Sequence, residues 1–111
     1  MPHKFLHIGF TFAGPPRMKD LEPAFAASGD DWIRYSAASW IVWTEKSAAD
    51  WYIIVKPYIA AYEYILIVGL DMADRFGWQP KYIWDWIDSK RGLPRNYLLE
   101  ALQNMPKPPD D

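Results

Sequence analysis

The chain contains no cysteine, no strong excess of either charge and no long uncharged hydrophobic segment. Without cysteine it can form no disulfide, no thiolate metal site and no cysteine nucleophile, and such a chain suits the reducing cytoplasm. Twelve basic and fourteen acidic side chains give a formal net charge of −2, which argues against a protein that wraps duplex nucleic acid through a basic surface. The longest apolar stretch, residues 51–70, contains Lys56, Pro57 and Glu63 and therefore predicts no membrane span. We expect a soluble, cytoplasmic protein with no membrane partner.

Hydrophobic residues are abundant and supply the material for a core. They make up 50% of the 111 residues, and aromatic residues alone make up 17%. These values exclude a disordered or collagen-like chain, and the length allows one domain. We expect that single domain over residues 1–104, followed by a disordered proline-rich tail over residues 105–111.

Alternating and continuous apolar segments predict four strands. They are expected over residues 5–12, 32–36, 40–44 and 64–70. The last segment is apolar without interruption, which is typical of a central strand buried on both faces of a sheet.

Capping signals predict helices between and after these strands. Asp20 is the expected N-cap of the first helix, and Gly29 follows its end. Residues 47–50, Ser-Ala-Ala-Asp, have the spacing of a capping box and begin the second helix. Pro80 suits the first position of a third helix, and a short further helix is expected over residues 95–103.

The order of these elements predicts the fold class. It is β-α-β-β-α-β with an added C-terminal helix, which is the ferredoxin-like arrangement of the α+β class. This arrangement has a four-stranded antiparallel sheet with two helices on one face. The other face is left open and must meet solvent or a partner.

Two segments carry a resemblance to a known family. The expected hairpin, Trp-Ile-Arg-Tyr-Ser at 32–36 and Ser-Trp-Ile-Val-Trp-Thr at 39–44, resembles the central hairpin of the SinR-like proteins. The segment Gly-Trp-Gln-Pro-Lys-Tyr-Ile-Trp-Asp-Trp at 77–86 resembles the terminal segment of some members. SinR-like proteins are small bacterial relatives of the CRISPR-associated protein that accompanies the spacer integrase, and of the VapD ribonucleases. The resemblance covers residues 4–87, and it implies a ferredoxin-like fold and favours a homodimer.

The resemblance also implies a metal site that this chain departs from. In that superfamily the first strand usually ends in an aspartate that can hold a divalent metal at a dimer interface. Thr11 stands at the matching position, and a neutral hydroxyl is a poor magnesium ligand. Asp71 and Asp74, just past the last strand, could bind a metal or act as an acid/base pair, although solvation and helix capping are commoner roles. We therefore expect no catalytic residue, metal or cofactor, the alternative being a Mg²⁺-dependent nuclease that uses Asp71, Asp74 and Thr11.

Alternation along the first strand divides its side chains between the two faces of the sheet. Leu6, Ile8 and Phe10 are expected to face the helices. Because an unpaired guanidinium is costly in a core, Arg34 of the second strand is expected to point outward. The residues expected on the open face are Phe5, His7, Thr11, Trp32 and Arg34.

The third helix supplies one further interface candidate. Its expected buried stripe consists of Ile83, Trp86 and Ile87. Trp84 points away from that stripe and is expected to contact a second subunit. The predicted interface residues are Phe5, His7, Trp32, Arg34 and Trp84.

An aromatic open face is compatible with two kinds of partner. It could form a self-complementary dimer patch, or it could stack the bases of a single strand of nucleic acid. The acidic charge balance and the resemblance favour the dimer. We therefore expect a non-enzymatic homodimer that acts through protein contacts, with a metal-dependent endoribonuclease or nuclease and a single-stranded nucleic-acid binder as the alternatives.

Overall fold

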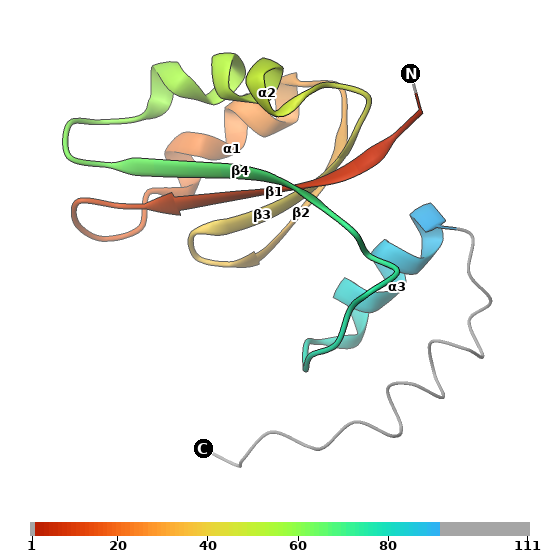
Figure 1. Cartoon of the computed structure of the whole chain (residues 1–111). Helices are drawn as coiled ribbons and strands as arrows, with labels where there is room; N and C mark the ends of the chain where they lie inside the picture. Colours follow the sequence, from red (N-terminus) through yellow and green to blue (C-terminus); the bar gives the residue numbers. More distant parts are fainter. Residues whose placement is uncertain (1, 92–111) are drawn as a thin grey trace, which may run out of the picture. The chain divides into compact units, whose positions relative to one another are not determined.

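A computed structural model describes residues 2–91 of the chain (Figure 1). It divides into two compact units, Met1–Asp71 and Met72–Asp111. The architecture is α+β and is compatible with the ferredoxin-like arrangement. Its elements in chain order are β1 (Lys4–Thr11), α1 (Met18–Ala27), β2 (Asp31–Ser36), β3 (Ser39–Thr44), α2 (Ala48–Val55), the 3₁₀ turn η1 (Lys56–Tyr58), β4 (Tyr64–Leu70) and α3 (Lys81–Arg91).

Three of the sequence predictions extend beyond the described residues. The helix expected over residues 95–103 and the tail at residues 105–111 lie outside them, and the domain predicted over residues 1–104 does so in part. Of the helices that the structure describes, none has the length and apolar character needed to cross a membrane.

The first unit is a four-stranded antiparallel sheet whose strand order is β2-β3-β1-β4. Helices α1 and α2 cover one face of this sheet (Figure 1). As predicted from alternation, β1 contributes Leu6, Ile8 and Phe10 to the core beneath them. The centre of that core is aromatic, with the ring of Phe25 stacked at 4.8 Å on that of Trp40. The buried core residues are Leu6, Ile8, Phe10, Leu21, Ala24, Phe25, Trp40, Val42, Trp51 and Val55.

Strand β4 lies at the edge of the sheet, so the prediction of a central strand is wrong. It pairs with β1 alone among the described strands, and β1 and β3 occupy the middle. Ile65 and Ile67 pack against the core, whereas Leu66 is 62% exposed and Val68 is 38% exposed. The continuous apolar run at residues 64–70 predicts burial on both faces. In the folded unit only one face of this strand is covered by α1 and α2.

Helix α1 begins one turn earlier than predicted. Its N-cap is Arg17, and Asp20 lies in the first turn, where its carboxylate accepts a hydrogen bond of 3.0 Å from the Arg17 guanidinium. Pro23 consequently lies in the helix interior. The predicted end is confirmed, because Gly29 adopts a left-handed φ of 80° directly after the C-cap residue Ser28.

Arg17 also ties the start of α1 to the segment that enters β4. Its guanidinium donates to the Glu63 carboxylate and, at 2.8 Å, to the carbonyl oxygen of Tyr58. Glu63 accepts a further hydrogen bond of 2.8 Å from the backbone N–H of Ala60. The Arg17 guanidinium, followed by this backbone donor, lowers the pKa of Glu63 to about 2. The carboxylate is therefore charged at all pH values at which the protein is expected to work.

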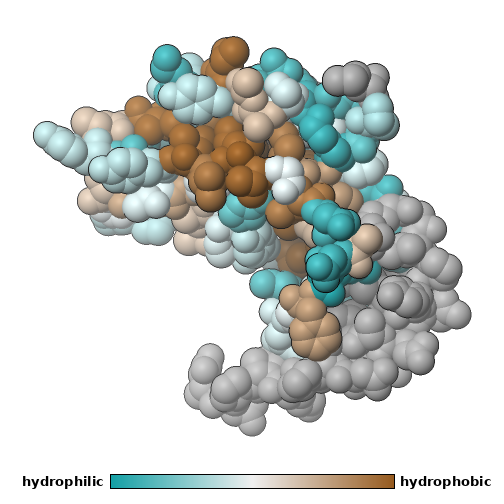
Figure 2. Space-filling view, viewed as in Figure 1, coloured by the Kyte–Doolittle hydropathy of each residue, from teal (hydrophilic) through white to brown (hydrophobic). Residues whose placement is uncertain are grey.

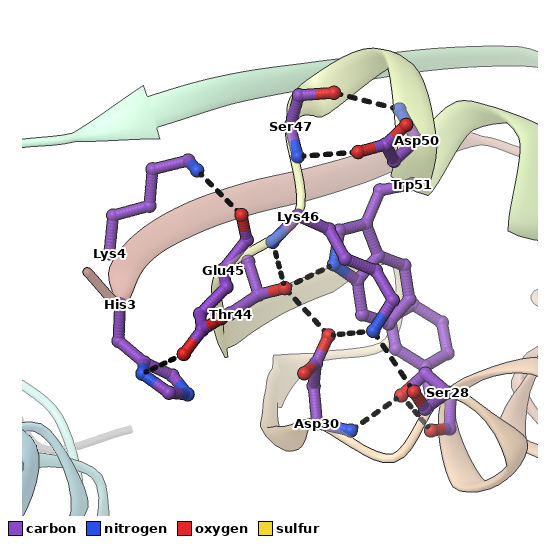
Figure 3. A network of polar contacts seen from close by, with 11 residues as sticks. His3, Lys4, Ser28, Asp30, Thr44, Glu45, Lys46, Ser47, Asp50 and Trp51 are labelled. Atoms are coloured by element: carbon purple, nitrogen blue, oxygen red, sulfur yellow. Dashed lines mark hydrogen bonds and ion pairs between the residues drawn. The ribbon is translucent and has the colours of Figure 1, made fainter. Parts of the chain in front are cut away.

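Helix α2 begins with the predicted capping box. The Ser47 hydroxyl accepts from the Asp50 backbone N–H at 3.1 Å, and the Asp50 carboxylate accepts from the Ser47 backbone N–H at 3.1 Å (Figure 3). The hydrogen bond from the Ser47 backbone N–H, followed by the Ser47 side chain, lowers the pKa of Asp50. They satisfy two N–H groups that the helix itself leaves without partners, and so they fix where the helix starts.

The end of β3 is joined to three other segments through one buried hydroxyl. Thr44 donates a hydrogen bond of 2.6 Å to the Asp30 carboxylate and accepts from the Lys46 backbone N–H at 2.9 Å and the Trp51 indole N–H at 3.1 Å (Figure 3). The Lys46 ammonium closes the network on Asp30 at 2.8 Å. A hydroxyl has one donor and two acceptor positions, and here all three are used.

Replacing Thr44 with valine should destabilise the protein by about 2 kcal/mol, because the buried indole N–H of Trp51 loses its acceptor. Urea unfolding followed by tryptophan fluorescence measures the difference. Thr44→Ser is the matched control: it keeps the hydroxyl and should cost less than the valine variant. Equal stability of the two variants would show that the hydroxyl contributes little.

Candidate functional site

The sheet face opposite α1 and α2, called here the open face, is defined by the strand register. Residues that lie directly opposite one another on neighbouring antiparallel strands point to the same side. Phe5 pairs with Trp43 and Leu70, and His7 pairs with Ile41 and Val68. The strand register assigns to this face Phe5, His7, Gly9, Thr11, Asp31, Ile33, Ser36, Ser39, Ile41, Trp43, Tyr64, Leu66, Val68 and Leu70. Tyr35 joins them through its contact with His7.

Two predicted interface residues lie on the opposite face. Trp32 pairs with Val42 and Arg34 pairs with Trp40, and both of these partners are in the core. The Trp32 ring accordingly packs against Phe25 of α1, with ring centroids 5.7 Å apart. The placement of Trp32 and Arg34 on the open face is therefore wrong.

The position of Arg34 has a physical reason. Strand β2 is an edge strand, so a long side chain can run along the margin of the helix layer and keep its charged head in water. The Arg34 guanidinium lies 4.0 Å from the carboxylate of Glu22 on α1. The desolvation cost that predicted an outward position applies to a central strand and does not arise at this edge.

Phe5 and His7 lie on the open face as predicted, but they are partly or wholly covered. Phe5 is 5% exposed, and its ring packs against Trp43 at 4.6 Å. His3 stacks on Trp43 at 5.3 Å. The His7 Nε2 atom lies 2.7 Å from the Tyr35 hydroxyl. These residues form a fixed aromatic layer across β1, β2 and β3.

The exposed apolar part of the open face is on β4. Tyr64 is 67% exposed, and Leu66 and Val68 continue the same row of alternate positions. Figure 2 shows hydrophobic side chains gathered over this strand. These three residues are not among the predicted interface residues, because the apolar run indicated a strand buried on both faces. The signal that could have found them is the two-residue period of β4 taken together with an edge position.

The described strand residues of the open face supply no positive charge. Among the described strand residues that point to it there is no lysine or arginine, and Asp31 is charged negatively. A surface that stacks single-stranded bases needs cations along the path of the phosphates. Arg34 is the one cation that the sequence predicted on this face, and it lies on the other face. The nucleic-acid interpretation therefore loses its candidate phosphate contact.

The structure does not bring the metal candidates together. Thr11 pairs with Tyr64 at one end of the β1–β4 ladder, and Phe5 pairs with Leu70, the neighbour of Asp71, at the other end. Six residues at about 3.3 Å each separate the two ends by about 20 Å, so Thr11 and Asp71 cannot share an ion. Asp74 belongs to the second unit. Within residues 2–91 no group of three or more histidine, aspartate or glutamate side chains is arranged to hold a metal.

In the second unit, Trp84 is buried, which contradicts its predicted outward position. It is 6% exposed, and Ile83 and Ile87 are buried on the same helix, while Trp86 is only partly buried. The Arg75 guanidinium lies 5.9 Å from the centroid of the Trp84 ring. The buried stripe of α3 thus includes Trp84 and is displaced from the one that the sequence pattern suggested.

Burial shifts the titration of His7. Desolvation of the ring lowers its pKa below the ordinary value of 6.5, since the charged imidazolium loses its water. The imidazole is therefore neutral at pH 7, and its hydrogen bond with the Tyr35 hydroxyl joins two uncharged groups. The open face gains no positive charge from this residue near neutrality.

Because Thr11 and Asp71 are far apart, Mg²⁺ or Mn²⁺ should not support cleavage of RNA or DNA by the purified protein. Asp71→Asn should leave the signal at the level of the native chain. Incubation of labelled single strands with each metal, resolved by gel electrophoresis, measures this. Metal-dependent cleavage that Asp71→Asn abolishes would show that Asp71 belongs to a working metal site after all.

The stability of the protein should fall as the pH drops below about 6.5. The folded state holds His7 with a lowered pKa, so the unfolded state binds more protons in this range and is favoured by acid. Urea midpoints at pH 7.5 and 5.5 measure the effect. His7→Phe should reduce the difference between the two midpoints. Tyr35→Phe should retain it, because desolvation of the ring is the cause of the shift.

Comparison with known proteins found no relative of this chain. No family model matches the chain, and neither a curated protein nor a solved structure does. The resemblance to SinR-like proteins stays a prediction from the sequence.

Proposed function

We propose that this chain is a non-enzymatic, ferredoxin-like protein of the SinR-like kind that works as a homodimer through protein contacts. The strand order β2-β3-β1-β4, with both helices of the first unit on one face, supports the ferredoxin-like part of the proposal. The open face supports the protein-contact part, because α1 and α2 lie on the other face and leave the exposed side chains of β4 available to a partner.

One observation carries the proposal: an exposed apolar row on a face whose described strand residues include no lysine or arginine. Tyr64, Leu66 and Val68 occupy alternate positions on β4, so their side chains are neighbours on the same side of the sheet. Exposed apolar side chains that occur singly are ordinary, but a contiguous group usually marks a contact with another protein. Burial of such a group against a second apolar surface releases its hydration water and favours association.

The non-enzymatic part of the proposal rests on the positions of the candidate groups. Thr11 and Asp71 lie at opposite ends of one ladder. Asp30 is engaged by Thr44 and Lys46, and Glu63 is engaged by Arg17. Carboxylates that already have cationic or hydroxyl partners are poorly placed to take up a metal or to move a proton.

The native chain should sediment at micromolar concentration as a species of twice the 13.0 kDa protomer mass. Leu66→Asp should raise the dissociation constant by roughly tenfold or more, since it places a charge in an apolar contact. Sedimentation equilibrium measures both proteins. A native chain that stays monomeric at high concentration would refute the homodimer.

Two controls make this experiment specific. Phe76→Asp introduces the same charge at a residue of the second unit that is 80% exposed, and it should leave the dissociation constant unchanged. Titration with a short fluorescent single strand at low salt tests the other kind of partner. Tight binding that weakens as salt rises would replace the protein-contact interpretation with nucleic-acid binding.

A further inference from the structure

The two edges of the sheet differ in how well they are protected. Natural edge strands usually carry charges, prolines or bulges that prevent pairing with another chain. The β2 edge has such devices, since it contains Asp31 and Arg34 and its register shifts between Arg34 and Ser36. The β4 edge, Tyr-Ile-Leu-Ile-Val-Gly-Leu, contains no charge and no proline, and its register with β1 is unbroken.

The unprotected edge also has free hydrogen-bonding capacity. Along a strand the backbone N–H and C=O groups of successive residues alternate in direction, so about half of those in β4 point away from β1. Among the described residues, no strand lies on that side of β4. The edge therefore offers a row of backbone donors and acceptors next to the exposed side chains of Leu66 and Val68.

A second copy of β4 fits this edge for a reason of charge and symmetry. In an antiparallel pair of identical strands related by a two-fold axis, a residue that stands n positions before the axis lies opposite the residue n positions after it. A charge on the strand would therefore need an opposite charge at the symmetry-related position, and a charge at the axis would meet its like. β4 has no charge to repel its counterpart. Two residues that lie opposite each other must also point to the same face of the sheet. The two-fold axis must therefore pass between the two copies of one and the same residue.

Ile67 is the middle residue of β4, so an axis at Ile67 pairs the strand over its whole length. With the axis there, Leu66 lies opposite Val68 of the second copy, and Tyr64 lies opposite Leu70 of the second copy. Ile65 lies opposite Gly69 of the second copy. Every side chain thus has an apolar side chain or glycine beside it on the second copy, and the exposed partners on the open face contact one another side by side.

We propose that β4 pairs with β4 of a second copy, antiparallel and centred on Ile67, to form one eight-stranded sheet. This inference rests on the proposed homodimer and specifies how it is built. A two-fold axis perpendicular to the sheet keeps α1 and α2 of both copies on the same side. The two open faces then form one continuous surface, and the rows on the two β4 strands lie at its centre.

Single cysteines test this register directly, because the native chain has none. In Ile67→Cys the two cysteines lie directly opposite each other, with Cα atoms about 4.5–5.5 Å apart, which is within disulfide range. Ile65→Cys is the matched control, since Ile65 is half-buried on the same side of the same strand. Its counterpart is displaced by four residues, about 13 Å, which is too far for a disulfide. Mild oxidation should therefore cross-link the Ile67→Cys protein and not the Ile65→Cys protein.

Hydrogen exchange of the native chain gives a second measurement that needs no substitution. The β4 amides that point away from β1 should exchange more slowly as the protein concentration rises and dimers form. A dimer in which these amides exchange as fast as in the monomer overturns the edge pairing and leaves the proposed homodimer intact. Cross-linking of Ile65→Cys in place of Ile67→Cys overturns the register. A native chain that is monomeric overturns the homodimer and the pairing together.

Discussion

The hydroxyl of Thr44 is the constraint on which the arrangement of the first unit depends. It lies where β3 ends, and its three hydrogen bonds join that point to the turn before β2, to the backbone that leads into α2, and to the indole of Trp51 within α2. A fully buried hydroxyl with all its partners satisfied holds its neighbours in one geometry, because each alternative leaves a polar group unpaired. The position of α2 over the sheet follows from this. Because α2 is held over one face of the sheet, that face is covered and the opposite face is the open face.

The two ends of the first unit are fixed by different chemistry. At the Thr44 end the contacts are short and include neutral groups that lie out of contact with water. At the other end a charged pair, Arg17 and Glu63, links the start of α1 to the entry of β4 and takes up the backbone groups of Tyr58 and Ala60. The second contact fixes the entry of β4, which pairs with β1 in unbroken register although it has a neighbour on one side only among the described strands.

Local signals predicted the parts of this structure that depend on few neighbours. The capping box at residues 47–50, the left-handed Gly29 and the inward side of β1 were all predicted correctly, because each follows from adjacent residues or from strand alternation. The face of Arg34 could not be predicted in this way. It depends on β2 being an edge strand, which is a property of the assembled sheet. The row of Tyr64, Leu66 and Val68 is exposed for a similar reason: β4 is at an edge, and these side chains lie on the face away from α1 and α2. A continuous apolar run indicates neither fact.

The uncharged sequence of β4 also has a consequence for the unfolded chain. A seven-residue apolar segment that is rich in β-branched and aromatic residues and has no charge or proline is the kind that forms intermolecular cross-β structure when it is exposed. Glu63 and Asp71 stand directly before and after it, and flanking charges of this kind oppose the stacking of such segments. Glu63 therefore has a role in both the folded and the unfolded protein. In the folded protein it binds Arg17, and before β4 has paired with β1 it opposes aggregation together with Asp71.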